Sequence, residues 1–236
     1  MSISAAVAGA TGLGAHITTQ LLANPSVSSV ISLTRRKHEI PEVSPKYNNI
    51  VNAETSTWYN EFHTALKNAG TSIAFSGLGS TRAQAGGLEN QRKIDVDLNY
   101  DLAKAAKETG TVKTYVLISS GGADSKSFAP YMKMKGELED KLIGLKFERT
   151  VILRPGFLMG DRGERSRMGE GLAIGLVNAT TMLLGNWLKD KIAAEGPVVA
   201  RAAIKAGLAQ GADWKGDENG VWIVDQSEVI RLGKSE

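Results

Sequence analysis

The glycine-rich segment near the N-terminus constrains the fold of this chain most strongly. An apolar run over residues 3–8 leads into Gly9-Ala10-Thr11-Gly12-Leu13-Gly14, and an amphipathic helical pattern over residues 13–23 follows at once. A turn this tight needs glycine, which also lets the backbone approach a pyrophosphate bound by the free N–H groups of the helix N-terminus. We expect a dinucleotide to bind at Gly9, Thr11, Gly12, Leu13 and Gly14; a glycine turn without a ligand is the alternative.

Strand-like and helix-like patterns alternate along the rest of the chain. Apolar, β-branched runs predict strands over residues 3–8, 30–34, 50–52, 72–76, 114–119, 150–153 and 221–224. Helical patterns lie between them, near residues 13–23, 57–69, 88–109, 130–144 and 197–209. This alternation predicts an α/β fold, a Rossmann-like doubly wound parallel sheet with helices on both faces.

The length of the chain predicts a single domain. Folds of the α/β class commonly reach this size undivided, so we expect residues 1–236 to form one NAD(P)-binding Rossmann domain. The alternation lapses after Arg154, and the glycine-rich segment 156–196 is charged early and apolar later. We expect that segment to form a small C-terminal lobe that covers the substrate.

The composition excludes several classes of function. The chain has no cysteine, which removes disulfides, thiolate metal sites and cysteine nucleophiles. Its three histidines lack the spacing of metal ligands, so we expect no metal site. The net charge of +3 is spread along the chain without a basic stripe that carries aromatic residues, and we expect no nucleic-acid partner.

We expect neither a cleaved targeting segment nor a membrane span. The N-terminus has no apolar signal and lacks the Arg-rich character of a mitochondrial presequence. An uncharged stretch covers residues 171–188, but polar side chains and three glycines within it argue against a transmembrane helix. We expect this stretch to be buried or to face the substrate; contact with a membrane surface or with another subunit is the alternative.

The end of the second expected strand indicates which dinucleotide binds. Proteins that select NAD usually have an acidic residue here, which binds the ribose 2′-hydroxyl. This chain has Arg35 and Arg36 instead. Two guanidinium groups suit a 2′-phosphate through charge-assisted bonds, so we expect NADP(H) and not NAD(H). Solvated surface charges after a strand are the alternative.

A Tyr-x-x-x-Lys spacing follows the fifth expected strand. That strand ends at Ser119-Ser120, and Tyr131 and Lys135 come next, on a helix whose first residue can be Pro130. Four residues apart, the two side chains lie on one face of the helix. The spacing often arises by chance, so its place after a nucleotide loop and a serine-ending strand is what indicates a catalytic pair.

In this order, the glycine loop, the serine and the Tyr-x-x-x-Lys pair resemble the short-chain dehydrogenase/reductase family. The segment "ILRPGFLMG" is similar to the Arg-Pro-Gly segment of its extended and atypical branches. The segments "GSTRAQAGGLENQRKIDVDLNYDLAKAAKETG" and "YMKMKGELE" resemble one atypical branch, the HIV Tat-interactive protein 2 group, and most of all its fungal relatives from the mitochondrial proteome. The resemblance covers residues 3–160 well and the remainder loosely.

The resemblance implies a role for each site residue. Tyr131 would protonate the substrate carbonyl oxygen, and the Lys135 ammonium would stabilise the resulting phenolate and bind the nicotinamide ribose. Ser120, or alternatively Ser119, would hydrogen-bond the carbonyl and stabilise its developing negative charge. Four further residues would lie at the cofactor, namely Gly77, Leu78, Pro155 and Gly156.

The chain departs from the family pattern at two places. The family's loop often reads Gly-x-x-Gly-x-x-Gly, whereas here Gly14 comes one place early and Ala15 fills the third position. Alanine still allows fairly close helix packing, so we expect cofactor binding to survive. Many family members also use an asparagine in the proton relay; Asn99 lies in about the right helix, and we leave it outside the catalytic set.

The sequence therefore predicts an NADPH-dependent carbonyl reductase that acts on an aldehyde or ketone. The alternative is an NADPH-binding regulatory or interaction protein with little turnover, which would not need the Ser-Tyr-Lys set. A nucleotide-sugar epimerase is disfavoured because the chain is short and lacks the acidic residue after the second strand. The resemblance implies a mitochondrial location, peripheral on the outer membrane, and otherwise a cytoplasmic one; the oligomeric state is open, with a dimer among the alternatives.

The first Tyr-x-x-x-Lys copy offers a test of this assignment. Tyr100 and Lys104 precede the serine-ending strand, on a helix whose apolar positions make Tyr100 a packing or surface residue. We expect Tyr100→Phe to leave kcat and KM unchanged, within about twofold, because packing needs only the ring. A large kinetic loss in this variant would mean that the wrong tyrosine has been assigned.

Overall fold

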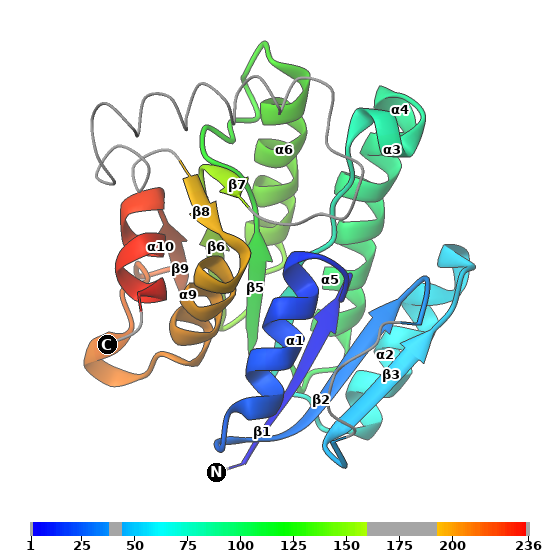
Figure 1. Cartoon of the computed structure of the whole chain (residues 1–236), viewed down its shortest axis with the longest axis vertical. Helices are drawn as coiled ribbons and strands as arrows, with labels where there is room; N and C mark the ends of the chain where they lie inside the picture. Colours follow the sequence, from blue (N-terminus) through cyan, green and yellow to red (C-terminus); the bar gives the residue numbers. More distant parts are fainter. Residues whose placement is uncertain (1, 38–43, 160–192, 235–236) are drawn as a thin grey trace.

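A seven-stranded parallel sheet forms the centre of the molecule (Figure 1). The computed structural model describes residues 2–37, 44–159 and 193–234. The strands of the sheet are β1 (Ile3–Ala8), β2 (Val27–Thr34), β3 (Tyr47–Val51), β4 (Ile73–Ser76), β5 (Thr114–Ile118), β6 (Arg149–Leu153) and β9 (Val221–Val224). Their spatial order is β3-β2-β1-β4-β5-β6-β9, and all neighbours are parallel. The predicted Rossmann-like α/β fold is confirmed.

Helices cover both faces of the sheet (Figure 1). One face carries α1 (Leu13–Ala23), α9 (Gly196–Leu208) and α10 (Gln226–Gly233). The other face carries α2 (Trp58–Asn68), α5 (Asn99–Glu108) and α6 (Pro130–Gly144). The short helices α3 (Arg82–Ala85) and α4 (Leu88–Arg92) follow β4 in the chain, and single 3-10 turns occur at Thr55–Thr57 and Gly211–Asp213.

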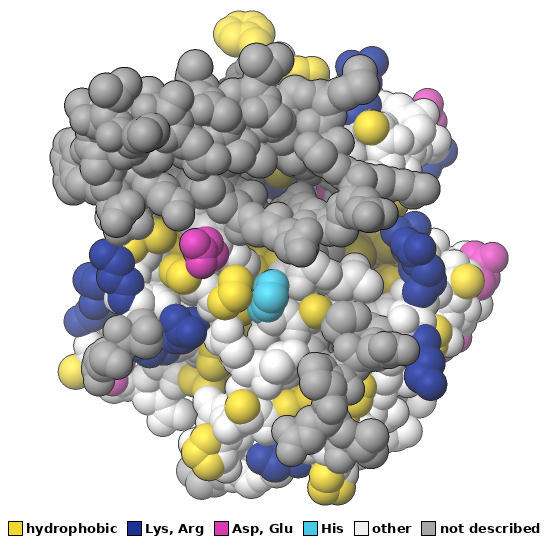
Figure 2. All heavy atoms as spheres, viewed as in Figure 1, with side chains coloured by type: hydrophobic (Ala, Val, Ile, Leu, Met, Phe, Trp, Pro, Cys, Tyr) yellow, Lys and Arg dark blue, Asp and Glu magenta, His cyan; other side chains and the backbone are white. Residues whose placement is uncertain are grey.

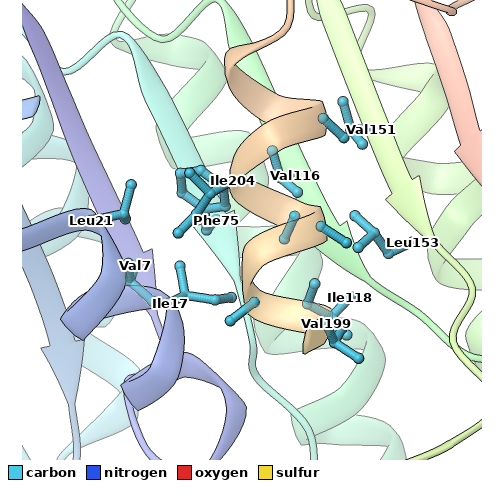
Figure 3. Close-up of a cluster of buried hydrophobic side chains, with 14 of the residues drawn as sticks. Val7, Ile17, Leu21, Phe75, Val116, Ile118, Val151, Leu153, Val199 and Ile204 are labelled. Atoms are coloured by element: carbon cyan, nitrogen blue, oxygen red, sulfur yellow. The ribbon is translucent and has the colours of Figure 1, made fainter. Parts of the chain in front are cut away.

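Each face of the sheet has its own apolar core, because a strand buried on both sides sends alternate side chains into two layers. Figure 3 shows the core beneath α1 and α9. There the strand side chains meet Ile17 of α1 and Val199 and Ile204 of α9; they are Val7, Phe75, Val116, Ile118, Val151 and Leu153. The core on the other face is built around Trp58, Phe62 and Leu66 of α2.

Most of the predicted elements are confirmed, with shifts of a few residues at their ends. The helix expected over residues 88–109 is instead α4, a π-helical turn over Lys93–Leu98 and α5 in succession. The sequence patterns do not predict α3 or α10. They also do not predict two short strands, β7 (Phe157–Met159) and β8 (Ala193–Glu195).

The segment expected to form the substrate lobe, residues 156–196, is described only at its two ends. There β7 and β8 pair in parallel as a separate two-stranded sheet. Residues 160–192, with the uncharged stretch 171–188, lie outside the described residues. Among the helices of the described ranges, none is long and apolar enough to cross a membrane.

The strand order reverses at β1, which has β2 on one side and β4 on the other. In open α/β sheets, ligands bind at such a reversal, beyond the carboxyl ends of the strands. The loops after β1 and β4 pack tightly there. A Cβ atom on Gly9 would lie 2.9 Å from the Leu78 nitrogen, and one on Gly77 would lie 3.1 Å from the Gly14 nitrogen.

Gly14 provides the most direct test of this packing, because its Cβ would lie only 2.1 Å from the Gly9 carbonyl oxygen. We expect Gly14→Ala to lower the free energy of unfolding by about 1–3 kcal/mol, measured by urea denaturation. The control is Gly144→Ala at the end of α6, where the new Cβ would meet nothing within 4 Å. That variant should be neutral or more stable by up to about 1 kcal/mol. Equal free energies of unfolding for the two variants would contradict the close contact between Gly14 and Gly9.

Candidate active site

The first turn of α1 is available to a phosphate group. Gly9 and Gly12 have φ angles of 74° and 56° and turn the chain from β1 into the helix. Among the described residues no side chain caps this helix, and its first turn has no acidic residue. The positive end of its dipole therefore meets no competing anion from this part of the chain. Thr11 and Gly12 are exposed and Leu13 is half-buried, whereas Gly14 is buried and serves the packing of the loop.

Arg35 and Arg36 are exposed directly after Thr34, the last residue of β2. The end of β2 lies beside the glycine loop, since the Gly9 N–H donates to the Leu33 carbonyl oxygen at 3.1 Å. Within the described part of the chain, neither guanidinium group makes a hydrogen bond or ion pair. Figure 2 shows Lys and Arg side chains along the flank where β2 and β3 lie. Both side chains are therefore free to meet an anion near the loop.

Lys135 is buried in α6, although an ammonium group is costly to bury without a partner. It is only 4% exposed, and it makes no hydrogen bond or ion pair with the residues that the structure describes. Its Nζ atom lies 5.9 Å from the centroid of the Tyr131 ring, one helical turn earlier. Because Tyr131 is 39% exposed, α6 presents a largely buried lysine next to a phenol that reaches the surface.

The two candidate serines at the end of β5 have different surroundings. Ser119 is buried, and its hydroxyl donates to the Glu139 carboxylate. Ser120 is half-buried, and within the described ranges its hydroxyl makes only a long bond, 3.4 Å, to the Gly121 carbonyl oxygen. Since a protein carboxylate already engages Ser119, Ser120 is the serine whose hydroxyl is available to a ligand.

The turn between β6 and β7 lies against the loop that follows Ser120. The Pro155 carbonyl oxygen accepts a hydrogen bond from the Gly121 N–H at 2.7 Å. The Gly156 N–H donates to Oε1 of Gln226, the first residue of α10, also at 2.7 Å. The ends of β5 and β6 and the start of α10 are thus fixed to one another at the carboxyl side of the sheet.

Asp95 is a buried group near Lys135 that the sequence patterns do not single out. Its carboxylate accepts the N–H of Ser80 at 2.7 Å and the hydroxyl of Ser80 at 3.2 Å. Asp95 Oδ1 and Lys135 Nζ lie 3.2 and 3.8 Å from the point where a Cβ on Gly79 would stand. Because Gly79 has no side chain, a buried carboxylate and a buried ammonium group border the same small space.

Asn99 is buried at the end of the π-helical turn and holds the loop after β4. Its amide nitrogen donates to the carbonyl oxygens of Leu78 at 3.0 Å and Asp95 at 3.3 Å. Its amide oxygen accepts the Ser76 hydroxyl at 2.5 Å. These contacts are structural, and they fix Leu78 against the glycine loop. A π-helical turn leaves no periodic signal in a sequence, which is why the register of this helix could not be read from the pattern.

Tyr100 and Lys104, the Tyr-x-x-x-Lys copy that comes earlier in the chain, lie apart from these residues. Tyr100 is half-buried on α5, and the Lys141 ammonium of α6 lies 5.1 Å from its ring centroid. Lys104 pairs with Glu108 one turn later, at 3.9 Å. Both residues therefore have the contacts of packing and surface groups.

A pocket of about 490 Å³ opens between α4 and α6. It lies on the α4 side of the helix that carries Tyr131, and it is lined by Leu88, Glu89, Arg92, Pro130, Lys133, Met134 and Glu137. Its wall includes the ion pair between Arg92 and Glu137, whose charged atoms are 2.5 Å apart.

Comparison with known proteins identifies the family. A family model described as HIM1 matches residues 40–183. The mitochondrial protein fmp52 of Emericella nidulans is 44% identical, covering 97% of this chain and 98% of that protein. The chain belongs to the HIM1 family. Protein fmp-52 of Neurospora crassa is 42% identical, covering 99% of this chain and 96% of its own.

The names of these HIM1 relatives confirm one part of the predicted resemblance. Both are fungal proteins described as mitochondrial. The likeness to the HIV Tat-interactive protein 2 group stays a prediction.

Solved structures share the fold of this HIM1 family member. A short-chain dehydrogenase family protein from Francisella tularensis has a TM-score of 0.65 at 16% identity, covering 97% of this chain and 99% of that one. UDP-glucuronic acid 4-epimerase from Bacillus cereus, in complex with NAD, has a TM-score of 0.67 at 12% identity, covering 94% and 76%. At such low identities the likeness shows the fold alone.

Proposed function

We propose that this HIM1 family member is an NADPH-dependent oxidoreductase that reduces the carbonyl group of an aldehyde or ketone. The observation that supports the proposal most directly is the pairing on α6 of Tyr131, which is 39% exposed, with Lys135, a largely buried residue that makes no hydrogen bond or ion pair with the described residues. A buried, unpaired cation is unfavourable for stability. A ligand that accepts a hydrogen bond from the Lys135 ammonium group would remove that cost.

The residues at the reversal of the strand order suit a dinucleotide that carries a 2′-phosphate. The uncapped first turn of α1 would bind the pyrophosphate. Arg35 and Arg36, exposed at the end of β2, would bind the 2′-phosphate. Lys135 would bond the nicotinamide ribose, and Pro155 and Gly156 would lie beside the nicotinamide. When bound, the reduced dinucleotide supplies a hydride.

Three side chains would then complete the reduction. The Tyr131 hydroxyl would give its proton to the carbonyl oxygen as the hydride adds to the carbonyl carbon, so that an alcohol forms. The Lys135 ammonium group would stabilise the phenolate that remains until solvent returns the proton. The Ser120 hydroxyl would donate a hydrogen bond to the oxygen as negative charge develops on it.

The experiment that tests the proposal is a panel of aldehydes and ketones assayed by the loss of NADPH absorbance. Turnover of any one of them supports the reductase. Tight NADPH binding without turnover of any carbonyl would instead favour the alternative, a regulatory protein that uses NADPH as a ligand.

The fungal relatives are described as mitochondrial, and we extend that location to this chain. The outer-membrane contact implied by the resemblance belongs to the same proposal. Fractionation followed by alkaline extraction tests both, because a peripheral protein is found with mitochondria and is released by the extraction; recovery in the cytosol alone would refute them.

Tyr131→Phe tests the proton donor. Removing the hydroxyl leaves the ring and its packing unchanged, so the Kd for NADPH should stay within about twofold. The kcat should fall by about 10²–10⁴-fold, which is the usual contribution of general acid catalysis. NADPH fluorescence gives the Kd and the carbonyl assay gives kcat; retained turnover would exclude the role assigned to Tyr131.

The double variant Arg35→Ala with Arg36→Ala tests the choice of cofactor. Each guanidinium would lose a charge-assisted hydrogen bond to the 2′-phosphate, so we expect the Kd for NADPH to rise by about 10–100-fold. The Kd for NADH, which lacks that phosphate, should change by less than about threefold. Both constants are measured by titration under the same salt conditions. An equal loss for the two cofactors would defeat the 2′-phosphate assignment.

A further inference from the structure

One buried carboxylate joins the ends of β5 and β6 to α6, the helix that carries Tyr131 and Lys135. Glu139 lies on α6, and it is only 2% exposed. It accepts the hydroxyl of Ser119, at the end of β5. It also accepts hydrogen bonds from two nitrogens of Arg154, the residue after β6. Nε of Arg154 lies 3.2 Å from Oε1 and 3.1 Å from Oε2 of Glu139, and Nη2 lies 2.5 Å from Oε2. We call Ser119, Glu139 and Arg154 the Glu139 cluster.

Each member of the Glu139 cluster is next to a proposed site residue. Ser119 precedes Ser120 in the chain, and Arg154 precedes Pro155. Glu139 follows Lys135 by four residues, one turn along α6, so the two side chains lie on the same face of the helix. A movement of any one member would therefore move a group that the proposed reaction needs.

The cluster is reinforced by backbone bonds between the same two strand ends. The Ser119 N–H donates to the Leu153 carbonyl oxygen at 2.8 Å, and the Gly121 N–H donates to the Pro155 carbonyl oxygen at 2.7 Å. Ser119 and Arg154 thus approach Glu139 from two strands that are already in register. The hydrogen bond with Glu139 also raises the pKa of the Arg154 guanidinium group, so this group keeps its positive charge at any ordinary pH.

An ion pair with one buried partner is a poor source of stability. Desolvation of the buried Glu139 carboxylate offsets much of its attraction to Arg154, whose side chain is 35% exposed. What the pair supplies is geometry, because a bidentate bond between a guanidinium group and a carboxylate fixes distance and orientation together. The pair between Arg92 of α4 and Glu137 of α6 is more exposed, and among the described residues it has no such link to the strand ends.

We propose that Glu139 is a positioning residue for the reduction. Its carboxylate holds the Ser119 hydroxyl inward, so that the hydroxyl of the next residue, Ser120, is directed to the substrate. It also holds Arg154, so that Pro155 stays beside the nicotinamide. The part of this inference that concerns the substrate and the nicotinamide rests on the proposed function. The part that concerns how firmly Glu139 holds the loops after β5 and β6 does not, and it can be tested on the protein without any ligand.

The test compares Glu139→Gln with Glu137→Gln, a matched control on the same helix. Hydrogen exchange in the full-length protein without ligand is followed over residues 119–123 and 154–157. We expect Glu139→Gln to speed exchange there by about tenfold or more, because the bond to Arg154 loses its charge and the loops open more often. Glu137→Gln should leave these rates unchanged. Unchanged exchange in Glu139→Gln would overturn the inference.

The catalytic arm uses the same two variants. We expect kcat to fall by about 10–100-fold in Glu139→Gln, with KM and the Kd for NADPH changed by less than about threefold, because the groups are misplaced and not removed. If the wild-type protein turns over no carbonyl while Glu139→Gln still speeds exchange, the proposed reaction fails and the positioning role stands. A wild-type kcat in Glu139→Gln would overturn the role in catalysis.

Ser119→Ala covers the case in which Glu139→Gln does not fold. This variant keeps the ion pair between Glu139 and Arg154 and removes only the bond to the hydroxyl. We expect faster exchange at residues 119–121, unchanged exchange at residues 154–157 and a fall in kcat of about tenfold. Exchange at wild-type rates throughout, together with a wild-type kcat, would show that Ser119 does not set the direction of Ser120.

Discussion

Backbone packing between Gly14 and Gly9 holds the start of α1 against the end of β1. The loop after β4 packs against the same two glycines. The space is too small for a side chain, since a Cβ on Gly14 would lie 2.1 Å from the Gly9 carbonyl oxygen. Gly77 packs on Gly14 and Leu78 packs on Gly9, which brings the loop after β4 to the same place. The first turn of α1 consequently opens at the reversal of the strand order, where an α/β sheet binds its ligand.

From this contact a series of buried polar groups leads to the proposed catalytic lysine. Asn99 bonds the Leu78 carbonyl oxygen, and the same amide nitrogen reaches the Asp95 carbonyl oxygen one turn earlier. The Asp95 carboxylate borders the space beside Gly79 that Lys135 also borders. Burial makes each of these groups costly without a partner, so the position of each depends on the next. The result is a site whose parts are fixed by polar contacts around a rigid sheet.

The sequence predicted the elements that carry a periodic signal and missed those that depend on capping or context. Alternating apolar runs and glycine turns gave β1, α1, β4 and α6 almost to the residue. The helix α10 is only eight residues long. Its signal was Asp225 followed by Glu228: the Asp225 side chain accepts the Ser227 hydroxyl and the Glu228 N–H, which hold its pKa below the usual range. The short pair β7 and β8 joins distant segments, and no local pattern can reveal such a pairing.

The sequence by itself determined the class of the fold, the glycine loop at the end of the first strand and the basic pair Arg35-Arg36 after the second. These follow from local spacing, because the period of a strand or helix and the need for glycine in a tight turn act within a few residues. Only the tertiary structure decided that Glu139 engages the hydroxyl of Ser119 and not that of Ser120, and that Asp95 is buried near Lys135. These contacts join strand ends and helices that are far apart in the chain. Their charges and hydrogen bonds matter because the groups are buried next to one another, and no local sequence pattern encodes that burial.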